Sequence, residues 1–155
     1  MLNWQKSLAH FNRQPTKYSR VVSIDCESTG IHLHHYSMPF MVCASADNGE
    51  NWTWMGKVNP LDRTVAWNRQ DTEEIEEFLQ HSDWLYVFTN AKFDIRCLSK
   101  ICNFDPYELL CRSFDTLFMH HCWNNREDHS LKNASIKYAG IADNDEQLLL
   151  KSVRE

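Results

Sequence analysis

The sequence has little glycine or proline, and it has no long hydrophobic run. Its 155 residues include four glycines and four prolines, and no linker-like stretch divides the chain, so we expect one domain. The longest apolar runs span only a few residues, which excludes a transmembrane helix of about 20 residues. Residues 1–20 carry charges and no continuous apolar stretch, so we do not expect a secretory signal there.

The sequence also lacks an excess of basic residues and any Cys-x-x-Cys pair. Sixteen basic residues against 21 acidic ones give a net charge of −5, which argues against non-specific coating of duplex DNA. The charge does not exclude an enzyme that meets phosphate groups through metal ions. The six cysteines have no metal-site spacing, and we expect them to be reduced thiols.

Short apolar runs alternate with amphipathic stretches, which predicts an α/β fold with a mixed sheet of about five strands. We expect strands at residues 21–24, 40–46, 52–58, 84–88 and 113–114. We expect helices at residues 2–12, 72–80, 91–102, 115–122, 131–138 and 143–155. Polar residues that suit the N-caps of these helices are Thr72, Asn90, Asp115 and Ser130. Asp47-Asn48-Gly49 suits a hairpin turn.

Two acidic residues, Asp25 and Glu27, directly follow the apolar run 21–24. Residues two apart in a strand point to the same face, so both carboxylates project together at the end of a buried strand. Two like charges about 4 Å apart cost roughly 4 kcal/mol at an effective dielectric near 20, and a hard divalent cation with oxygen ligands offsets that cost. Three other acid pairs with this spacing lie in polar segments, and a solvated strand end is the alternative interpretation of this pair.

A third acidic residue, Asp94, ends the segment Thr89-Asn90-Ala91-Lys92-Phe93-Asp94, which follows another apolar strand and opens a helix. An acidic residue in the first turn of a helix is favoured by the helix dipole. Taken alone, this segment therefore also fits an acid that only stabilises the helix and has no catalytic or metal-binding role. Ligands of α/β sheets bind at the carboxyl ends of strands. If the two strands are neighbours, the three carboxylates converge on one or two Mg²⁺ or Mn²⁺ ions.

Both acidic segments resemble motifs of a known enzyme family. Val-Ser-Ile-Asp-Cys-Glu-Ser-Thr-Gly resembles the first motif of the DEDD (DnaQ-like) 3′→5′ exonucleases, and Phe-Thr-Asn-Ala-Lys-Phe-Asp resembles the second. The later stretches 113–116, 129–133 and 137–141 are similar to the proofreading domain of family A DNA polymerases. The resemblance covers residues 20–142. It implies a ribonuclease-H-like fold, one exonuclease domain over residues 1–155, and a place in the cytoplasm of a bacterial or phage-infected cell.

The resemblance also implies roles for individual residues. Three of the four metal-binding acids of the family are matched by Asp25, Glu27 and Asp94. Positions that contact the 3′-terminal nucleotide or lie near the substrate are matched by Ser28, Ile31 and Asn90. The implied cofactors are two Mg²⁺ or Mn²⁺ ions in the complete site. The implied partners are a single-stranded DNA 3′ end and a polymerase domain in the same longer polypeptide.

The third motif of the family, Tyr-x-x-x-Asp or His-x-x-x-x-Asp, has no match in this sequence. Its acid is the fourth metal ligand, and its Tyr or His helps to activate the attacking water. Tyr138 is followed four residues later by Ala142, and His129 is followed five residues later by Ala134. We therefore expect a domain that is incomplete at its C-terminus, with weak cleavage or none in these 155 residues.

Two other functions fit the same motifs. One is a ribonuclease-D-like enzyme that trims RNA 3′ ends, and the other is an exonuclease-like domain that binds nucleic acid without cutting it. Lys92 and Arg96, which flank Asp94, fit either contacts to the nucleic-acid backbone or the exposed side of a helix.

For the remaining candidates we favour structural interpretations. Trp52 and Trp54 alternate along a strand, which favours packing over a binding platform. Asp115 fits a helix N-cap better than a fourth acid of the site. The histidine cluster His32, His34 and His35 favours a solvated loop between strands. A second cluster has a spacing that fits no zinc site: His120, His121, Cys122 and His129.

Overall fold

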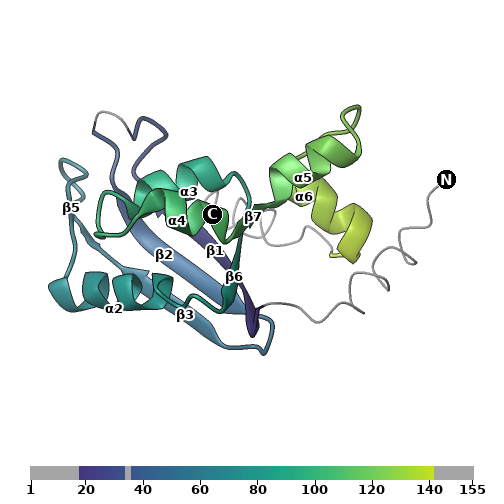
Figure 1. Ribbon diagram of the computed structural model, residues 1–155. Coiled ribbons are helices and arrows are strands. Elements are labelled where there is room, and N and C mark those ends of the chain that lie inside the picture. The colour runs from purple at the N-terminus through teal and green to yellow at the C-terminus, as the bar shows by residue number, and fades with distance from the viewer. Residues whose placement is uncertain (1–17, 34–35, 142–155) are drawn as a thin grey trace.

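The centre of the molecule is a five-stranded mixed sheet, seen in a computed structural model that describes residues 18–33 and 36–141 (Figure 1). The strands of this sheet are β1 (Arg20–Ser28), β2 (Pro39–Ala46), β3 (Asn51–Met55), β6 (Trp84–Phe88) and β7 (Ser113–Asp115). They lie in the order β3-β2-β1-β6-β7. The first two contacts are antiparallel and the last two parallel, so the predicted mixed α/β sheet is confirmed.

Among the described residues, six helical segments follow or flank the strands. They are α2 (Arg69–Leu79), α3 (Ala91–Leu98), α4 (Pro106–Cys111), α5 (Thr116–Trp123), α6 (Leu131–Ala134) and the π-helical turn η1 (Ser135–Ala139). Helices predicted at residues 2–12 and 143–155 lie outside the described residues. No helix in the described part of the chain has both the length and the apolar character needed to cross a membrane.

One hydrophobic core joins the sheet to α2, α3 and α4. Alternate residues of β1 point into it, and each large apolar side chain buried there contributes roughly 1.5–3 kcal/mol. Trp52 and Trp54 pack on the ring of Phe78 with centroid distances of 5.0 and 5.2 Å, so the predicted packing role of these tryptophans is confirmed. Ser23, Asp25 and Glu27 alternate with the buried residues of β1 and are exposed. The first acidic pair therefore lies on the face of the sheet opposite the core.

Two helix starts differ from the sequence prediction. Thr72 is not the N-cap of α2, because the helix begins at Arg69 and the side chain of Asn68 accepts a hydrogen bond from the Gln70 amide at 3.1 Å. Helix α4 was not predicted, although Asp105 followed by Pro106 is a typical start signal; its Asp105 carboxylate accepts from the Tyr107 amide at 2.8 Å. Six residues are too few to carry a clear helical periodicity.

The strand predicted over residues 52–58 is interrupted at Gly56. β3 ends at Met55, and Lys57–Val58 forms a separate strand, β4, which pairs with β5 (Val65–Ala66) as a short hairpin. Gly56 is buried, and a Cβ atom there would lie 2.7 Å from Cγ1 of Val65 and 3.0 Å from the ring of Trp67. The absence of a side chain at Gly56 therefore lets the hairpin close against the end of β3.

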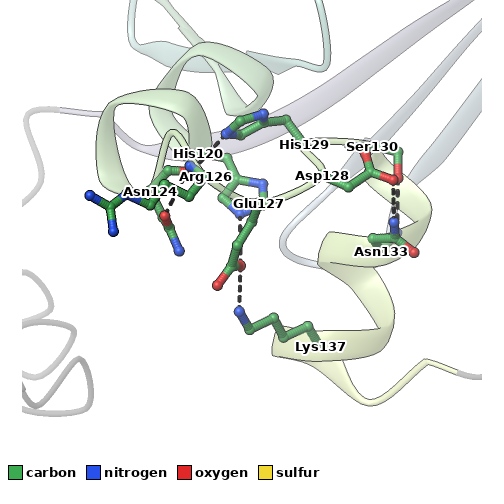
Figure 2. A network of polar contacts seen from close by, with 9 residues as sticks. All are labelled: His120, Asn124, Arg126, Glu127, Asp128, His129, Ser130, Asn133 and Lys137. Atoms are coloured by element: carbon green, nitrogen blue, oxygen red, sulfur yellow. Dashed lines mark hydrogen bonds and ion pairs between the residues drawn. The ribbon is translucent and has the colours of Figure 1, made fainter.

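The C-terminal described helices are held by polar contacts rather than by a core. Figure 1 shows α5 and α6 beyond the β7 edge of the sheet, apart from α2 and α3. No apolar residue of α5, α6 or η1 is buried, and the side chain of His120, only 10% exposed, packs against the rings of His129 and Tyr138. In the loop between α5 and α6, drawn in Figure 2, the ring of His129 contacts the Asn124 carbonyl at 2.7 Å, and Glu127 forms an ion pair with Lys137. Ser130 caps α6, as predicted, and Gly140 ends η1 with a φ of 67°.

Candidate active site

The carboxyl half of β1 has no strand partner on the side of β6. β6 pairs only with Arg20–Ser23, while β1 continues to Ser28. The side chain of Asp94, from the first turn of α3, reaches this unpaired part of β1. The backbone amide of Cys26 donates a hydrogen bond to Oδ1 of Asp94 at 2.9 Å. Asp94 therefore lies against the strand at the residue between Asp25 and Glu27.

Asp94 is a buried carboxylic acid, with a side chain only 2% exposed. Burial raises the pKa of Asp94 to about 7, and the nearby negative charge of Asp25 raises it as well, while the Cys26 amide opposes the shift. No Lys, Arg or His of the described residues forms an ion pair with Asp94. Because a buried charge without a counter-ion is costly, this position favours either a proton or a bound cation.

Asp25 and Glu27 project from the open face of β1 and are both exposed. In the antiparallel pairing with β2 they lie opposite Cys43 and Met41. The register shifts between Glu27 and Ser28, which marks the point where β1 leaves the regular sheet. The two acids thus stand at the edge from which Asp94 approaches, and the influence of Asp25 on the pKa of Asp94 reflects their proximity.

The donor set suits a hard divalent cation, although it is not closed around one. Three carboxylates from two segments offer only oxygen ligands, the type that Mg²⁺ and Mn²⁺ prefer. Within residues 18–33 and 36–141, no group of three or more His, Cys, Asp or Glu side chains is already gathered closely enough to hold a metal ion. The thiol of Cys26 adds no ligand, because its hydrogen bond with Cys97 and its burial raise its pKa and keep it neutral.

The residues expected to meet the substrate lie at the end of β1. Ser28 donates its hydroxyl hydrogen to the carbonyl oxygen of Gly30 at 2.6 Å, which tightens the turn that follows the strand. Ile31 projects from that turn with 80% of its surface exposed. An apolar side chain so exposed, four residues after Glu27, is available to contact an aromatic base.

Asn90 does not act as the side-chain cap of α3. Its backbone has a φ of 70°, in the left-handed region, and its side chain makes no capping bond. The carboxylate of Asp115 accepts instead, from the amides of Asn90 at 3.1 Å and Ala91 at 2.9 Å. The same carboxylate caps α5 through Leu117, so the predicted N-cap role of Asp115 is confirmed. Asn90 is exposed, and its amide group is not used in capping.

A cavity of about 340 Å³ lies beside Asn90, between the start of α3 and α5. The residues that line it are Asn90, Lys92, Asp115, Leu117, Phe118, His121 and His129. Sequence reasoning did not connect the two histidines with the second acidic motif, because they are about 30 and 40 residues away from it. The contact follows from the position of β7, which brings α5 beside the start of α3.

A family model described as "3'-5' exonuclease" matches residues 1–152 of the chain. None of the curated proteins compared with the chain matches it. The match covers both acidic motifs and nearly the whole sequence, and the family predicted from those motifs is therefore confirmed.

Solved structures with the same fold include proteins from two bacteria. Brucella melitensis NrnC bound to pGG is 18% identical, with a TM-score of 0.56 over 83% of this chain and 56% of that one. The same protein with bound Mg²⁺ has a TM-score of 0.56 and 18% identity, over 83% and 57% of the two chains. The zinc-bound E. coli ExoI–ssDNA complex has a TM-score of 0.57 and 17% identity, over 75% and 34%. The ribonuclease-H-like exonuclease fold is thus confirmed, and the chain spans little more than half of NrnC.

Proposed function

This chain belongs to the 3′-5′ exonuclease family, and on that premise we propose that it removes nucleotides from single-stranded DNA 3′ ends by metal-dependent hydrolysis. We further propose that it serves as the proofreading module of a family A DNA polymerase, with the polymerase domain in the same longer polypeptide. The observation that carries the proposal is the hydrogen bond from the Cys26 amide to Asp94, which anchors the third acid between the other two.

Asp25, Glu27 and Asp94 are the residues that would hold the metal ions. Two divalent ions bound by such acids supply an activated water and neutralise the charge that develops on the phosphate. Asp94 contributes by its placement: the Cys26 amide fixes one carboxylate oxygen and leaves the other to a ligand. Asp25 and Glu27 bring negative charge to an exposed edge that a nucleic-acid end can reach.

The end of a single strand would meet Ile31 and Asn90 beside these acids. Ile31 offers an exposed apolar surface to the terminal base, and Asn90 offers an amide that its own helix does not use. Single-stranded binding of this kind needs little base-specific hydrogen bonding, so we expect little sequence preference. The ssDNA complex of ExoI and the pGG complex of NrnC support a single-stranded substrate.

A second candidate function is binding without cleavage. It is favoured by the lack of the third motif in the sequence and by the absence, among the described residues, of a preformed group of three metal ligands. In that case the chain would hold a nucleic-acid end for another domain. Trimming of RNA ends, the remaining alternative, differs from the main proposal only in the sugar of its substrate.

The test combines metal binding with cleavage, using Asp94→Asn. Asparagine keeps an oxygen that accepts from the Cys26 amide but loses the charge that holds a cation. We expect Mn²⁺ to raise the melting temperature of the wild type but not of Asp94→Asn, and we expect cutting of 5′-labelled DNA in enzyme excess to fall by at least about a hundredfold. Asp47→Asn, at an exposed turn of the β2–β3 hairpin, is the matched control and should behave as the wild type.

The outcomes separate the candidates. Equal cutting rates and equal Mn²⁺ shifts in the wild type and Asp94→Asn would contradict the assignment of the site. A Mn²⁺ shift with DNA binding and no cutting by the wild type would select the non-cleaving function. Faster shortening of an RNA than of a DNA of the same sequence would select RNA trimming.

A further inference from the structure

A second cavity, of about 490 Å³, lies between the loop that follows β1 and the β4–β5 hairpin. Its lining combines hydroxyl, aromatic and charged side chains from both elements: Thr29, Tyr36, Met38, Asp62, Arg63, Thr64 and Val65. Thr29 belongs to the first acidic motif, but the other six residues belong neither to the acidic motifs nor to the residues matched to the substrate site. The cavity is therefore a feature that the proposed function has not used.

The hairpin wall of this cavity is fixed to β2, the strand that pairs with the acid-bearing β1. Nε1 of Trp67 donates to the carbonyl oxygen of Pro39 at 2.8 Å, and the Gly56 amide donates to the carbonyl oxygen of Phe40 at 2.8 Å. Pro39 pairs with Ser28 at the end of β1. Thr29, on the opposite wall, follows Glu27 by two residues, which is roughly 7 Å along an extended chain. The cavity thus opens next to the catalytic edge of the sheet.

Arg63 brings to the cavity a positive charge that forms no ion pair among the described residues, although the Asp62 carboxylate also lines the cavity. Its guanidinium makes no hydrogen bond or ion pair with any residue in the part of the chain that the structure describes. Its backbone is held in place, with a φ of 59° and an amide that donates to the Asn59 carbonyl at 2.9 Å. The neighbouring Asp62 carboxylate is engaged by the amide and the hydroxyl of Thr64, at 3.0 and 2.8 Å. The cation is therefore available to an anionic ligand.

Tyr36 supplies an aromatic surface on the other wall. Its side chain is 75% exposed, and its ring lies 6.0 Å from that of His32 in a tilted arrangement. Ile31, the residue matched to the terminal base, precedes it on the same loop and is also exposed. An exposed aromatic ring beside an arginine is the combination that binds a base and its phosphate in single-stranded nucleic acid.

We propose that this cavity is a nucleotide subsite, in which Tyr36 stacks on a base of single-stranded nucleic acid and Arg63 pairs with its phosphate. This subsite rests on the proposed exonuclease function, because it extends the same binding edge away from the three acids. In a chain with a net charge of −5, a guanidinium without an ion-pair partner gives a nucleic-acid strand a local point of attraction.

The test measures binding of a ten-nucleotide, 5′-fluorescein-labelled single-stranded DNA to the full chain in EDTA. EDTA removes the contribution of metal ions and blocks cutting, so the cavity is measured separately from the acids. We expect Tyr36→Ala to weaken binding about five- to a hundredfold, and Tyr36→Phe to retain it. We expect Arg63→Gln to weaken binding and to lower the slope of log K against log salt by about 0.7, the value for one lost phosphate contact, with Arg63→Lys keeping the slope.

Matched controls carry the same substitutions away from the cavity. Tyr107→Ala removes a tyrosine of α4 that is 74% exposed, and Arg69→Gln removes an exposed arginine of α2. Both should bind as the wild type, and circular dichroism should give unchanged melting curves for the two cavity variants. Unchanged affinity and salt slope in Tyr36→Ala and Arg63→Gln, or no binding by the wild type, would overturn the subsite.

A cleavage assay in Mn²⁺ separates this proposal from the function on which it rests. If the wild type cuts DNA ends and both cavity variants bind and cut equally well, the subsite is wrong and the exonuclease function stands. If the cavity variants lose binding as expected and the wild type does not cut, the subsite stands and the cleavage proposal is wrong.

Discussion

At the scale of single residues, the side chain of Asp115 joins the starts of two helices. Its carboxylate accepts hydrogen bonds from the first amides of α3 and from the Leu117 and Phe118 amides of α5. One acid thus fixes two helix starts, and one of these helices carries Asp94. The placement of the candidate metal ligand therefore depends on a residue that would not itself bind metal.

We predict that Asp115→Ala destabilises the chain by about 1–4 kcal/mol, because two caps of about 0.5–2 kcal/mol each are lost. Urea unfolding measures this free energy. The control is Asp105→Ala, which removes the cap of α4 alone and should cost about half as much. Equal effects of the two substitutions would contradict the double role. Asp115→Asn should restore part of the lost stability, because its side-chain oxygen still accepts hydrogen bonds.

Tyr86 is a buried phenol whose hydroxyl donates to the carbonyl oxygen of Phe78 at 2.6 Å. Burial raises the pKa of Tyr86 to about 12 from its ordinary value of 10, although the charge of Arg112 opposes the shift. The folded chain therefore keeps this proton at pH values where the unfolded chain loses it. The stabilising contribution is complete below pH 10 and is lost as the pH rises from 10 to 12.

We predict that Tyr86→Phe costs about 1–2 kcal/mol at neutral pH, because the Phe78 carbonyl loses its donor in the core. Between pH 10 and 12 the difference between the wild type and the variant should fall by up to roughly 3 kcal/mol, the equivalent of a two-unit shift. Urea unfolding at a series of pH values measures both the stability difference at neutral pH and its decrease between pH 10 and 12. A difference that stays constant up to pH 12 would show that the phenol is not held in its neutral form by the fold.

At the scale of elements, the strands and turns that could be predicted from the sequence are those marked by apolar runs and local turn residues. The short apolar run at residues 21–24 and the Asp-Asn-Gly turn identified the first strands. The two acidic motifs were found because each follows a short apolar run in the sequence. The hydrogen bond from Cys26 to Asp94 could not be predicted, because it depends on where β6 separates from β1. The left-handed backbone of Asn90 depends in the same way on Asp115, a residue 25 positions away.

The break between β3 and β4 at Gly56 also depends on residues that are distant in the sequence. Nothing in residues 52–58 signals that Val65 and Trp67 approach within 3.0 Å of the place of a Cβ atom. We predict that Gly56→Ala destabilises the chain by about 1–3 kcal/mol, because the hairpin must move to admit the methyl group. Thermal or urea unfolding measures this loss of stability. Gly49→Ala is not a suitable control, because Gly49 has a φ of 88° and alanine would strain the backbone there. Ser45→Ala, on the open face of β2, is the control and should change stability by less than about 0.5 kcal/mol.

At the scale of the whole molecule, two kinds of structure meet at β7. The sheet with α2, α3 and α4 is built around buried apolar side chains. The segment from α5 to η1 buries none, and exposed apolar residues recur along it: Phe118, Trp123, Leu131 and Ile136. Surface ion pairs such as that of Glu127 with Lys137 contribute only about 0–1 kcal/mol each. Local unfolding of the sheet with α2, α3 and α4 therefore exposes buried apolar side chains, whereas local unfolding of the segment from α5 to η1 exposes none and should cost less free energy.

We predict that backbone amides of residues 116–139 exchange with solvent at least about tenfold faster than those of β1 and β6, because opening this segment exposes no core side chain. Native-state hydrogen exchange followed by mass spectrometry measures the difference. Helix α3 is the internal control: its start shares the Asp115 carboxylate with α5, but it buries Ile95, Cys97 and Leu98, so its amides should exchange with those of the sheet. Equal protection of α5 and α3 would mean that the polar loop of Figure 2 couples the segment to the core more strongly than its burial indicates.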